Sequence, residues 1–280
     1  MISYLQAILL GALQGVAELF PISSLGHTVL IPAVLRWPID RGSDAFLSFL
    51  VLTHLATALV LVGFFWRDWM KIAAGIGRSL ARREVGTDDT YARLGWLLIV
   101  GTIPAGILGL LFEDALKSIF ASAVIVAIAL VLNGAVLLAV ELLRRRAAPE
   151  GARDDTKLAR LSYTTAFAIG VAQCLALIPG FSRTGLTIAG GLVSGLSHEN
   201  AGRFSFLLAT PIILAAAVLK VPQLFVTGVG LGEALVGALC AALSAWLSVR
   251  FLVRYFETRT LTPFAIYCVV AGLAALLLVR

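Results

Sequence analysis

Charged residues are scarce in this chain. Asp, Glu, Lys and Arg together make up 14% of its 280 residues, whereas hydrophobic residues make up 60%. A soluble domain usually carries about 25% charged residues, so this composition cannot cover a water-facing surface and indicates an integral membrane protein. The formal net charge of +6 would suggest nucleic-acid binding in a soluble protein. In a membrane protein it indicates basic loops on the cytoplasmic side, and we expect no nucleic-acid partner.

Cysteine is also rare, and basic residues are missing from the N-terminal segment. The three cysteines, Cys174, Cys240 and Cys268, all lie in apolar segments, so neither a disulfide framework nor a cysteine metal site is predicted. No Lys or Arg precedes Arg36. The N-terminus therefore lacks the charged region that opens a signal peptide, and we expect it to belong to the mature protein.

Six apolar stretches are predicted to cross the membrane as helices. Each approaches the roughly 20 residues needed to span about 30 Å of hydrocarbon. They cover residues 46–66, 94–112, 121–143, 203–221, 229–252 and 260–279. The fourth is short, and Arg203 and Lys220 bracket it, as expected of a helix whose ends snorkel to the two interfaces.

Residues 1–35 and 163–197 are apolar as well, but proline and glycine interrupt both. The first is broken at 20–27 (FPISSLGH) and the second at 179–185 (PGFSRTG). Each break leaves arms of roughly 15 residues, about 22 Å of helix, which are too short to span. Both regions are therefore predicted to form re-entrant helical hairpins, whose irregular tips must be buried by protein or face a watery cavity. The predicted fold is a single all-α integral membrane domain, residues 1–280, with six transmembrane helices and two re-entrant hairpins.

Basic residues are distributed unevenly between the predicted loops. Segments 67–93, 144–162, 197–203 and 250–259 would share one face of the membrane, and they hold 16 of the 22 Lys and Arg residues. The positive-inside rule makes this face cytoplasmic, which places both termini outside.

The two broken regions resemble each other and indicate an internal repeat. In order, Gly11, Gln14, Pro21, Ser24 and Gly26 correspond to Gly170, Gln173, Pro179, Ser182 and Gly185. A second match follows, where residues 48–50 and 205–207 both read Ser-Phe-Leu. The halves, about 1–143 and 163–280, are joined by the basic cytoplasmic loop 144–162, and each holds one hairpin and three spans. Because three is odd, the second half starts on the opposite face, and inverted repeats of this kind tend to place their site where the broken helices meet.

Few ionisable residues fall inside the predicted spans and hairpins, and a charge at membrane depth is a functional candidate by default. The deep candidates are Glu18, His27, His54 and Arg183. Of these, His54 is predicted either as a packed polar residue facing the bundle or as a catalytic one. Three others near predicted helix ends are expected at the membrane interface: Glu141, Glu233 and His198.

The first hairpin combines a carboxylate with a polar turn. Gln14 and Glu18 are four residues apart and share one face of the first arm. Ser23, Ser24 and His27 follow in the break, where N–H groups at a helix start could hold an anion. The alternative is that these serines only cap a helix.

The second hairpin supplies the complementary positive charge. Its break is followed by a guanidinium and three hydroxyls: Ser182, Arg183, Thr184 and Thr187. Arginine binds phosphate oxygens through two parallel hydrogen bonds. The alternatives are that Arg183 snorkels to the lipid headgroups or only pairs with Glu18.

These segments resemble the undecaprenyl-pyrophosphate phosphatase family, the bacitracin-resistance phosphatases of the bacterial envelope. Residues 11–27 (GALQGVAELFPISSLGH) are similar to its first signature and residues 179–187 (PGFSRTGLT) to its second. Segments 53–69, 93–114 and 203–220 extend the resemblance over nearly the whole chain.

The chain departs from the commonest family pattern at three positions. Gln14 stands where Glu is frequent, Thr184 where Ser is frequent, and Cys268 where Arg often follows the tyrosine. The amide of Gln14 is a weaker metal ligand than a carboxylate.

The resemblance implies hydrolysis of the C55 polyprenyl diphosphate to the monophosphate carrier lipid and inorganic phosphate, which recycles the carrier and gives bacitracin resistance. It also implies a site that opens to the outer face of the bacterial cytoplasmic membrane and a need for Mg²⁺ or Ca²⁺.

Roles for individual residues follow from the same resemblance together with their chemistry. Ser24 is the candidate nucleophile, and His27 is its base or the acid for the leaving group. Glu18 either orients His27 or, with Gln14, holds the cation. Arg183 neutralises the diphosphate, and five other residues would bind phosphate with it: Ser23, Gly180, Ser182, Thr184 and Thr187. Direct attack by water is the alternative, with Ser24 only positioning phosphate.

A transporter is the rival function, because inverted repeats with paired broken helices are typical of carriers. Such a protein would flip a polyprenyl phosphate or another anion across the membrane, and a chain with both activities is a third possibility. Membrane lipids are expected partners in each case.

Small residues at 237–238 and 241–242 could allow close helix packing within one chain or between the subunits of a homodimer.

Overall fold

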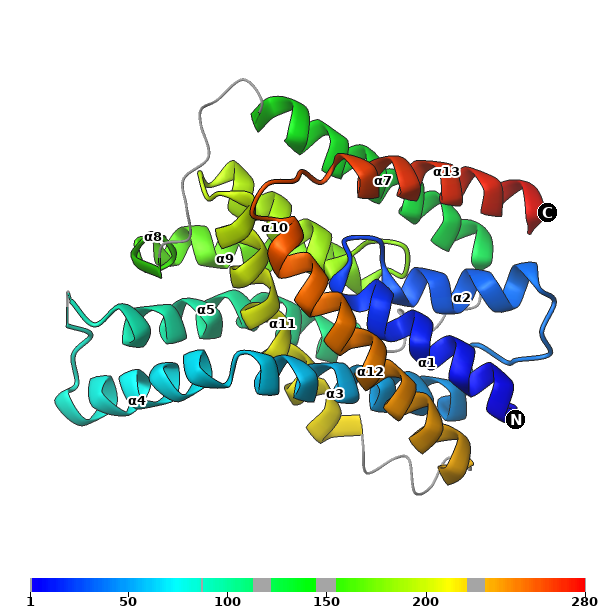
Figure 1. Cartoon of the computed structure of the whole chain (residues 1–280), viewed down its shortest axis with the longest axis horizontal. Helices are drawn as coiled ribbons and strands as arrows, with labels where there is room; N and C mark the ends of the chain where they lie inside the picture. Colours follow the sequence, from blue (N-terminus) through cyan, green and yellow to red (C-terminus); the bar gives the residue numbers. More distant parts are fainter. Residues whose placement is uncertain (1, 87, 113–121, 145–154, 221–229, 280) are drawn as a thin grey trace.

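The computed structural model describes residues 2–86, 88–112, 122–144, 155–220 and 230–279, and these residues form helices and no strand (Figure 1). The α-helices in chain order are α1 Tyr4–Leu19, α2 Ser24–Val34, α3 Asp44–Phe64, α4 Trp66–Arg82, α5 Thr90–Leu111, α7 Ala123–Arg144, α8 Asp155–Ala159, α9 Tyr163–Gln173, α10 Arg183–Val193, α11 His198–Lys220, α12 Leu231–Tyr255 and α13 Thr262–Leu278. A 3₁₀ turn, η1 Cys174–Leu177, follows α9. The predicted all-α class is confirmed.

Five of these helices, α3, α5, α7, α11 and α12, are long and apolar enough to cross a membrane. They correspond to five of the six predicted spans. The sixth, predicted at 260–279, is the 17-residue helix α13, about 25 Å long at 1.5 Å per residue. Parts of the predicted loops and span ends, at 113–121, 145–154 and 221–229, lie outside the described residues.

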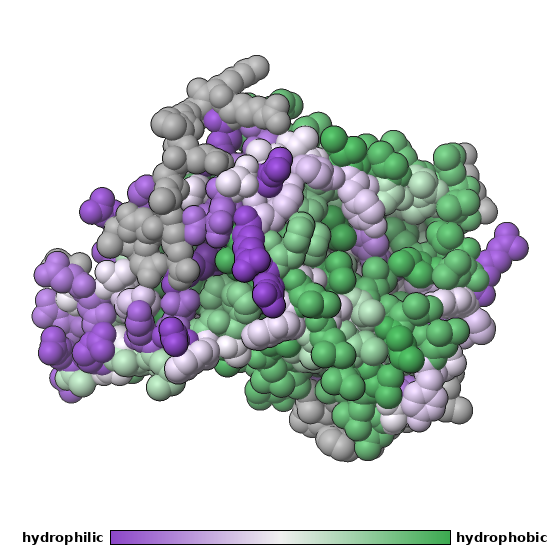
Figure 2. All heavy atoms as spheres, in the orientation of Figure 1, coloured by the Kyte–Doolittle hydropathy of each residue, from purple (hydrophilic) through white to green (hydrophobic). Residues whose placement is uncertain are grey.

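The surface fits a multi-pass membrane protein. Figure 2 shows hydrophilic side chains gathered at the end formed by α4 and the start of α5, and hydrophobic side chains over most of the opposite half. On α12 the outward positions are large and apolar, since Leu235, Leu239 and Leu243 are each more than half exposed. Large apolar side chains facing outward are stable where the surroundings are lipid.

Small residues let α1 and α12 pack closely within the chain. A Cβ atom added to Gly11 would lie 2.1 Å from the carbonyl oxygen of Gly237, and one added to Gly15 would lie 2.1 Å from that of Ala241. Gly237 and Ala241 are two of the small residues considered above for helix packing, and the structure uses them inside one subunit.

Both broken regions are helical hairpins, and their breaks overlap the predicted ones but are shorter at the C-terminal side, because α2 already begins at Ser24 and α10 at Arg183. Figure 1 shows α1 running inward from the end that carries the N-terminus and α2 returning to that end, while α9 and α10 do the same from the opposite end. We call residues 20–23 the first tip and residues 178–182 the second tip. The two tips meet near the centre of the molecule, and the N- and C-termini lie at the same end.

The two halves of the chain pack into each other, and their contacts follow the repeat. Helix α1 of the first hairpin packs on α12, and α9 of the second packs on α5. In the same way α2 touches α13 while α10 touches α7, and α3 packs against α11. Each hairpin is therefore packed against helices of the other half.

Three residues expected at the interface are instead buried in polar contacts, which corrects the sequence prediction. Glu141 is 2% exposed and accepts hydrogen bonds from the Leu261 backbone and, at 3.0 Å, from His198, which is 1% exposed. Arg203, predicted to snorkel, donates to Asp68 at 2.7 Å and is 5% exposed. Each side chain has a partner from another helix, which offsets the cost of burying a charge.

Candidate active site

The two tips are joined through the side chain of Ser23. Its Oγ accepts hydrogen bonds from the backbone N–H of Gly26 and of Gly180, both at 3.1 Å. Ser23 is the N-cap of α2 and has a positive φ of 71°. Gly180 has a φ of 110°, and a Cβ atom there would lie 2.4 Å from the Val126 carbonyl oxygen, so only glycine fits this crossing.

The capping interpretation of the serines holds for one serine in each tip. Ser23 caps α2, and Ser182 caps α10 by accepting from the Gly185 N–H at 3.0 Å. Ser24 and Arg183 are consequently the first residues of the two helices. Their side chains are the ones that meet the carboxylate of the first hairpin.

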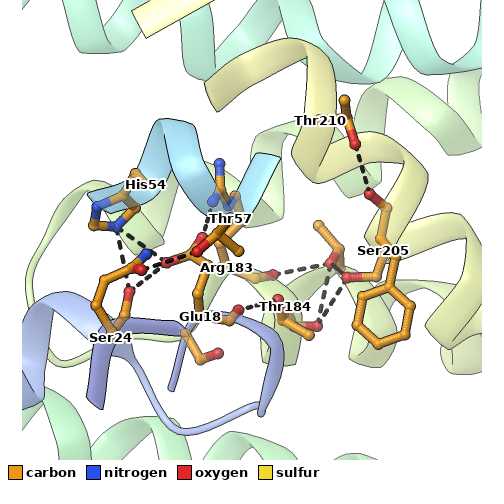
Figure 3. Close-up of polar contacts among 12 residues, drawn as sticks. Glu18, Ser24, His54, Thr57, Arg183, Thr184, Ser205 and Thr210 are labelled. Carbon is orange, nitrogen blue, oxygen red and sulfur yellow. Dashed lines mark hydrogen bonds and ion pairs between the residues drawn. The ribbon is translucent and has the colours of Figure 1, made fainter. Parts of the chain in front are cut away.

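Glu18 is the centre of a polar cluster that also contains Ser24, His54 and Arg183 (Figure 3). Glu18 and Ser24 are buried, and the side chains of His54 and Arg183 are partly exposed. One carboxylate oxygen, Oε1, accepts from Arg183 Nη2. The other, Oε2, accepts from Ser24 Oγ and lies 3.1 Å from His54 Nε2. The predicted Glu18–Arg183 pair is therefore present, and it joins α1 to α10. Arg183 is not in position to snorkel, because its guanidinium points at this carboxylate.

His54 is the histidine that lies beside the candidate nucleophile. Its Nε2 is 3.4 Å from Ser24 Oγ, and its Nδ1 is 2.7 Å from the carbonyl oxygen of Leu50. A carbonyl only accepts, so Nδ1 carries a proton and Nε2 faces the cluster. His54 can then take a proton from Ser24 when neutral or pair with Glu18 when charged, which suits the catalytic interpretation of this residue.

His27 lies on the other side of the first tip. Its Nδ1 is 2.7 Å from the Ser23 carbonyl oxygen, and its Nε2 is 2.8 Å from the Tyr267 hydroxyl of α13. Both nitrogens are thus engaged away from Ser24. The structure brings Glu18, Ser24 and Arg183 together as predicted, but it does not bring His27 to them.

The remaining predicted site residues, Gln14, Gly180, Thr184 and Thr187, do not line the cavity beside the cluster. Thr184 Oγ1 donates to the Glu18 carbonyl oxygen at 2.8 Å, and Thr187 Oγ1 donates to the Arg183 carbonyl oxygen at 2.9 Å. Both threonines are 1% exposed, and their hydroxyls contact the backbone of α1 and α10 and do not line the cavity. Gln14 is fully buried, and its Oε1 accepts from Thr57 Oγ1 at 2.9 Å. The N–H of Gly180 is already bonded to Ser23.

A cavity of about 410 Å³ opens beside the cluster. Next to the cluster it is lined by Glu18, Ser23, Ser24, His54, Ser182 and Arg183, and its other polar lining residues are Asp44, Ser48, Gln173 and Lys220. The rest of the wall is apolar and comes mainly from α3, α5, η1 and α11. This combination suits an amphiphile with an anionic head, because the guanidinium and hydroxyls can bind oxygens while the tail stays among apolar side chains.

Comparison with known proteins agrees with this chemistry. The family model described as bacitracin resistance protein BacA matches residues 7–274. The chain is 50% identical to an undecaprenyl-diphosphatase of Mycolicibacterium paratuberculosis, over 98% of this chain and 97% of that protein. It is 45% identical to an undecaprenyl-diphosphatase of Granulibacter bethesdensis, over 97% and 95% of the two chains. It is also 47% identical to undecaprenyl-diphosphatase 2 of Burkholderia ambifaria, over 95% and 93%. The chain belongs to the bacitracin resistance protein BacA family.

Proposed function

We propose that this protein is an undecaprenyl-diphosphatase, which hydrolyses undecaprenyl diphosphate to undecaprenyl phosphate and inorganic phosphate. The observation that carries the proposal is the placement of Ser24, Glu18, His54 and Arg183 at the polar end of an apolar cavity. The names of the relatives support the same activity. A carrier alone has no need for a hydroxyl that donates to a carboxylate beside a histidine and an arginine.

The geometry supports attack by Ser24 on the terminal phosphorus. A bond forms between Ser24 Oγ and that phosphorus, the bond to the bridging oxygen breaks, and undecaprenyl phosphate leaves with the electron pair. The serine proton passes to Glu18 Oε2 or His54 Nε2, the two acceptors next to Oγ. Water then attacks the phosphoserine, inorganic phosphate is released and Ser24 recovers a proton. In the alternative, His54 activates water for direct attack.

Arg183 provides the charge that this reaction needs. A guanidinium has five N–H donors, so Arg183 can keep its bond to Glu18 and still bind phosphate oxygens from the cavity side. Preorganised positive charge stabilises the negative charge on the equatorial oxygens of the phosphoryl group in the transition state. The Thr187 hydroxyl bonded to the Arg183 carbonyl fixes the start of α10 and with it the position of this side chain.

The predicted cation, Mg²⁺ or Ca²⁺, fits Glu18 but not Gln14. Glu18 lines the cavity, and although its oxygens accept from Arg183 and Ser24, a carboxylate has further lone pairs for a cation. The Gln14 oxygen is fully buried away from the cavity and is bonded to Thr57. Such ions are often held by one or two carboxylates together with substrate phosphates. We propose that Glu18 and the diphosphate would hold it, and that it would neutralise charge on the phosphate oxygens.

The topology proposed for the membrane has six spans, with α13 as the short sixth, and two re-entrant hairpins in one domain. The shared end of the two termini and the repeated helix contacts support it. With the basic end at α4 and α5 in the cytoplasm, the termini lie outside. Asp44, the first residue of α3, lines the cavity, and this supports an opening to the outer face. A homodimer stays a prediction.

The test of this function is phosphate release from undecaprenyl diphosphate by the purified protein in detergent. Detergent leaves no separate compartments, so an enzyme releases phosphate there while a carrier does nothing measurable. We expect multiple turnovers, and we expect EDTA to stop them and Mg²⁺ or Ca²⁺ to restore them. Transport of polyprenyl phosphate into sealed vesicles without phosphate release in detergent would contradict the enzyme and favour the carrier.

The apolar wall of the cavity predicts where the first isoprenoid units lie. Gly109 of α5 lines the cavity, and a Cβ atom there would be 3.7 Å from the nearest atom, of Leu177. A Gly109→Leu side chain can therefore enter without a backbone clash and occupy space meant for the lipid. We expect KM for undecaprenyl diphosphate to rise about tenfold, the effect of losing burial of about two methylene groups, with a similar rise for the shorter farnesyl diphosphate, because it contains the same first isoprenoid units.

The matched control is Gly63→Leu in α3, where an added Cβ atom meets nothing within 4 Å and the residue is not part of the cavity. Equal KM values for the Gly109→Leu variant and the wild type would show that the chain lies elsewhere.

A further inference from the structure

Asn133 stands alone as a polar residue in the apolar part of α7. The helix runs from Ala123 to Arg144, and no other polar side chain precedes Glu141. Asn133 is fully buried. Burying an amide in an apolar helix costs free energy unless its hydrogen bonds are made. The hydrogen-bond partners of Asn133 therefore indicate its role.

Those partners are the two tips. Asn133 Nδ2 donates to the carbonyl oxygen of Pro21 in the first tip at 3.2 Å. Asn133 Oδ1 accepts from the backbone N–H of Ser182 in the second tip at 3.0 Å. A single side chain therefore bridges segments that are about 160 residues apart in the sequence.

The bridge satisfies two backbone groups that the helix breaks leave open. The N–H at a helix start has no intrahelical partner, and Ser182 is the N-cap of α10. The carbonyl of Pro21 follows the end of α1 and precedes the start of α2. An amide is suited to this position because it offers a donor and an acceptor on one rigid group.

The position of Ser182 connects this bridge to the chemistry. Ser182 directly precedes Arg183, and Pro21 lies three residues before Ser24. We propose that Asn133 is a positioning residue, which sets the distance between Arg183 and Ser24 by holding the two tips together. This inference rests on the proposed phosphatase function, because it concerns the same site.

Cys268 provides a comparison at the same carbonyl. Its Sγ lies 3.7 Å from the Pro21 oxygen and 3.4 Å from Asn133 Nδ2. A thiol is a weak donor, and Cys268 reaches only the first tip. In this chain, Asn133 makes the stronger bond to Pro21 from the opposite helix.

The experiment compares Asn133→Leu, Asn133→Asp and Cys268→Ala in the detergent assay. Asn133→Leu removes both bonds at similar volume, and we expect kcat to fall about 100-fold, the scale of a 1 Å misplacement of reacting groups. Cys268→Ala removes only a weak contact and should stay within about threefold of wild type, since it leaves the bridge intact. Wild-type kcat in a folded Asn133→Leu protein would overturn the inference.

Asn133→Asp tests the hydrogen bonds apart from packing. When protonated, its carboxyl group offers the one donor and one acceptor that the bonds to Pro21 and Ser182 need, and when ionised it can no longer donate to Pro21. We expect its kcat, relative to wild type, to recover as pH is lowered. A ratio that stays well below one at every pH would contradict positioning by hydrogen bonds, even if the leucine variant did not fold. An inactive wild type would instead refute the proposed function.

Discussion

Replacing Arg183 with alanine is expected to lower kcat/KM for undecaprenyl diphosphate by about 1,000-fold. Loss of an arginine that stabilises a transferring phosphoryl group typically costs about 10³- to 10⁵-fold. In this site the substitution has a second effect, because Arg183 pairs with Glu18. Without the guanidinium, the carboxylate faces the cavity with less compensating charge and repels the diphosphate. Phosphate release by the purified variant in detergent, over a range of substrate concentrations, measures both effects.

Two further variants make the Arg183 result specific. Arg183→Lys keeps the charge but loses the planar fork, so we expect activity between those of the alanine variant and the wild type. Arg78→Ala removes an arginine from a more exposed ion pair with Asp89, and such pairs contribute little to stability, so its activity should be unchanged. A kcat/KM near the wild-type value for the Arg183→Ala variant would remove Arg183 from the proposed mechanism.

The positions of the helix breaks could be predicted because their causes are local. Proline and glycine at 21 and 179–180 interrupt two apolar segments, and the structure ends α1 at Leu19 and begins α10 at Arg183. The pairing of Glu18 with Arg183 could also be predicted from the sequence. Each was the charged residue placed deep in its own hairpin, and an inverted repeat brings such hairpins together.

The choice between the two histidines could not be made from the sequence. His27 lies three residues after Ser24, and the resemblance made it the candidate base or the acid for the leaving group. The structure turns its ring toward Ser23 and Tyr267 instead. His54 lies thirty residues from Ser24, and it reaches the site only because α3 packs against α1. That contact depends on tertiary packing, which no local pattern encodes.

Buried ion pairs were missed for the same reason. Arg203 and Glu141 both lie near the ends of apolar stretches, where snorkelling is the usual outcome. Their partners, Asp68 and His198, come from other helices. The sequence does show one acidic residue, Asp68, close to the end of an apolar segment, which indicates that it needs a positively charged partner. Which arginine or lysine pairs with Asp68 cannot be identified without the fold.

Replacing Ser24 with alanine is expected to lower kcat at least about 1,000-fold if the serine is the nucleophile, with little change in substrate binding. Removing a nucleophile leaves only the rate enhancement that comes from binding and electrostatics. The hydroxyl donates to Glu18 and lies 3.4 Å from His54 Nε2, so its proton has a direct route away. A single turnover of substrate that is radiolabelled at the terminal phosphorus, stopped by rapid quench, should leave label on Ser24 of the wild type. The alanine variant should carry no label.

The activities of two histidine variants, compared with that of Ser24→Ala, distinguish attack by Ser24 from attack by water. His54→Ala removes the group next to Ser24 and should lower kcat by about 10²- to 10⁴-fold, the usual contribution of a general base. His27→Ala leaves Ser24, Glu18 and His54 in contact, so its effect should be at least tenfold smaller. If no phosphoserine forms and Ser24→Ala keeps more activity than His54→Ala, water is the nucleophile and His54 is its base. An effect of His27→Ala larger than that of His54→Ala would contradict both routes, because neither gives His27 a proton to transfer.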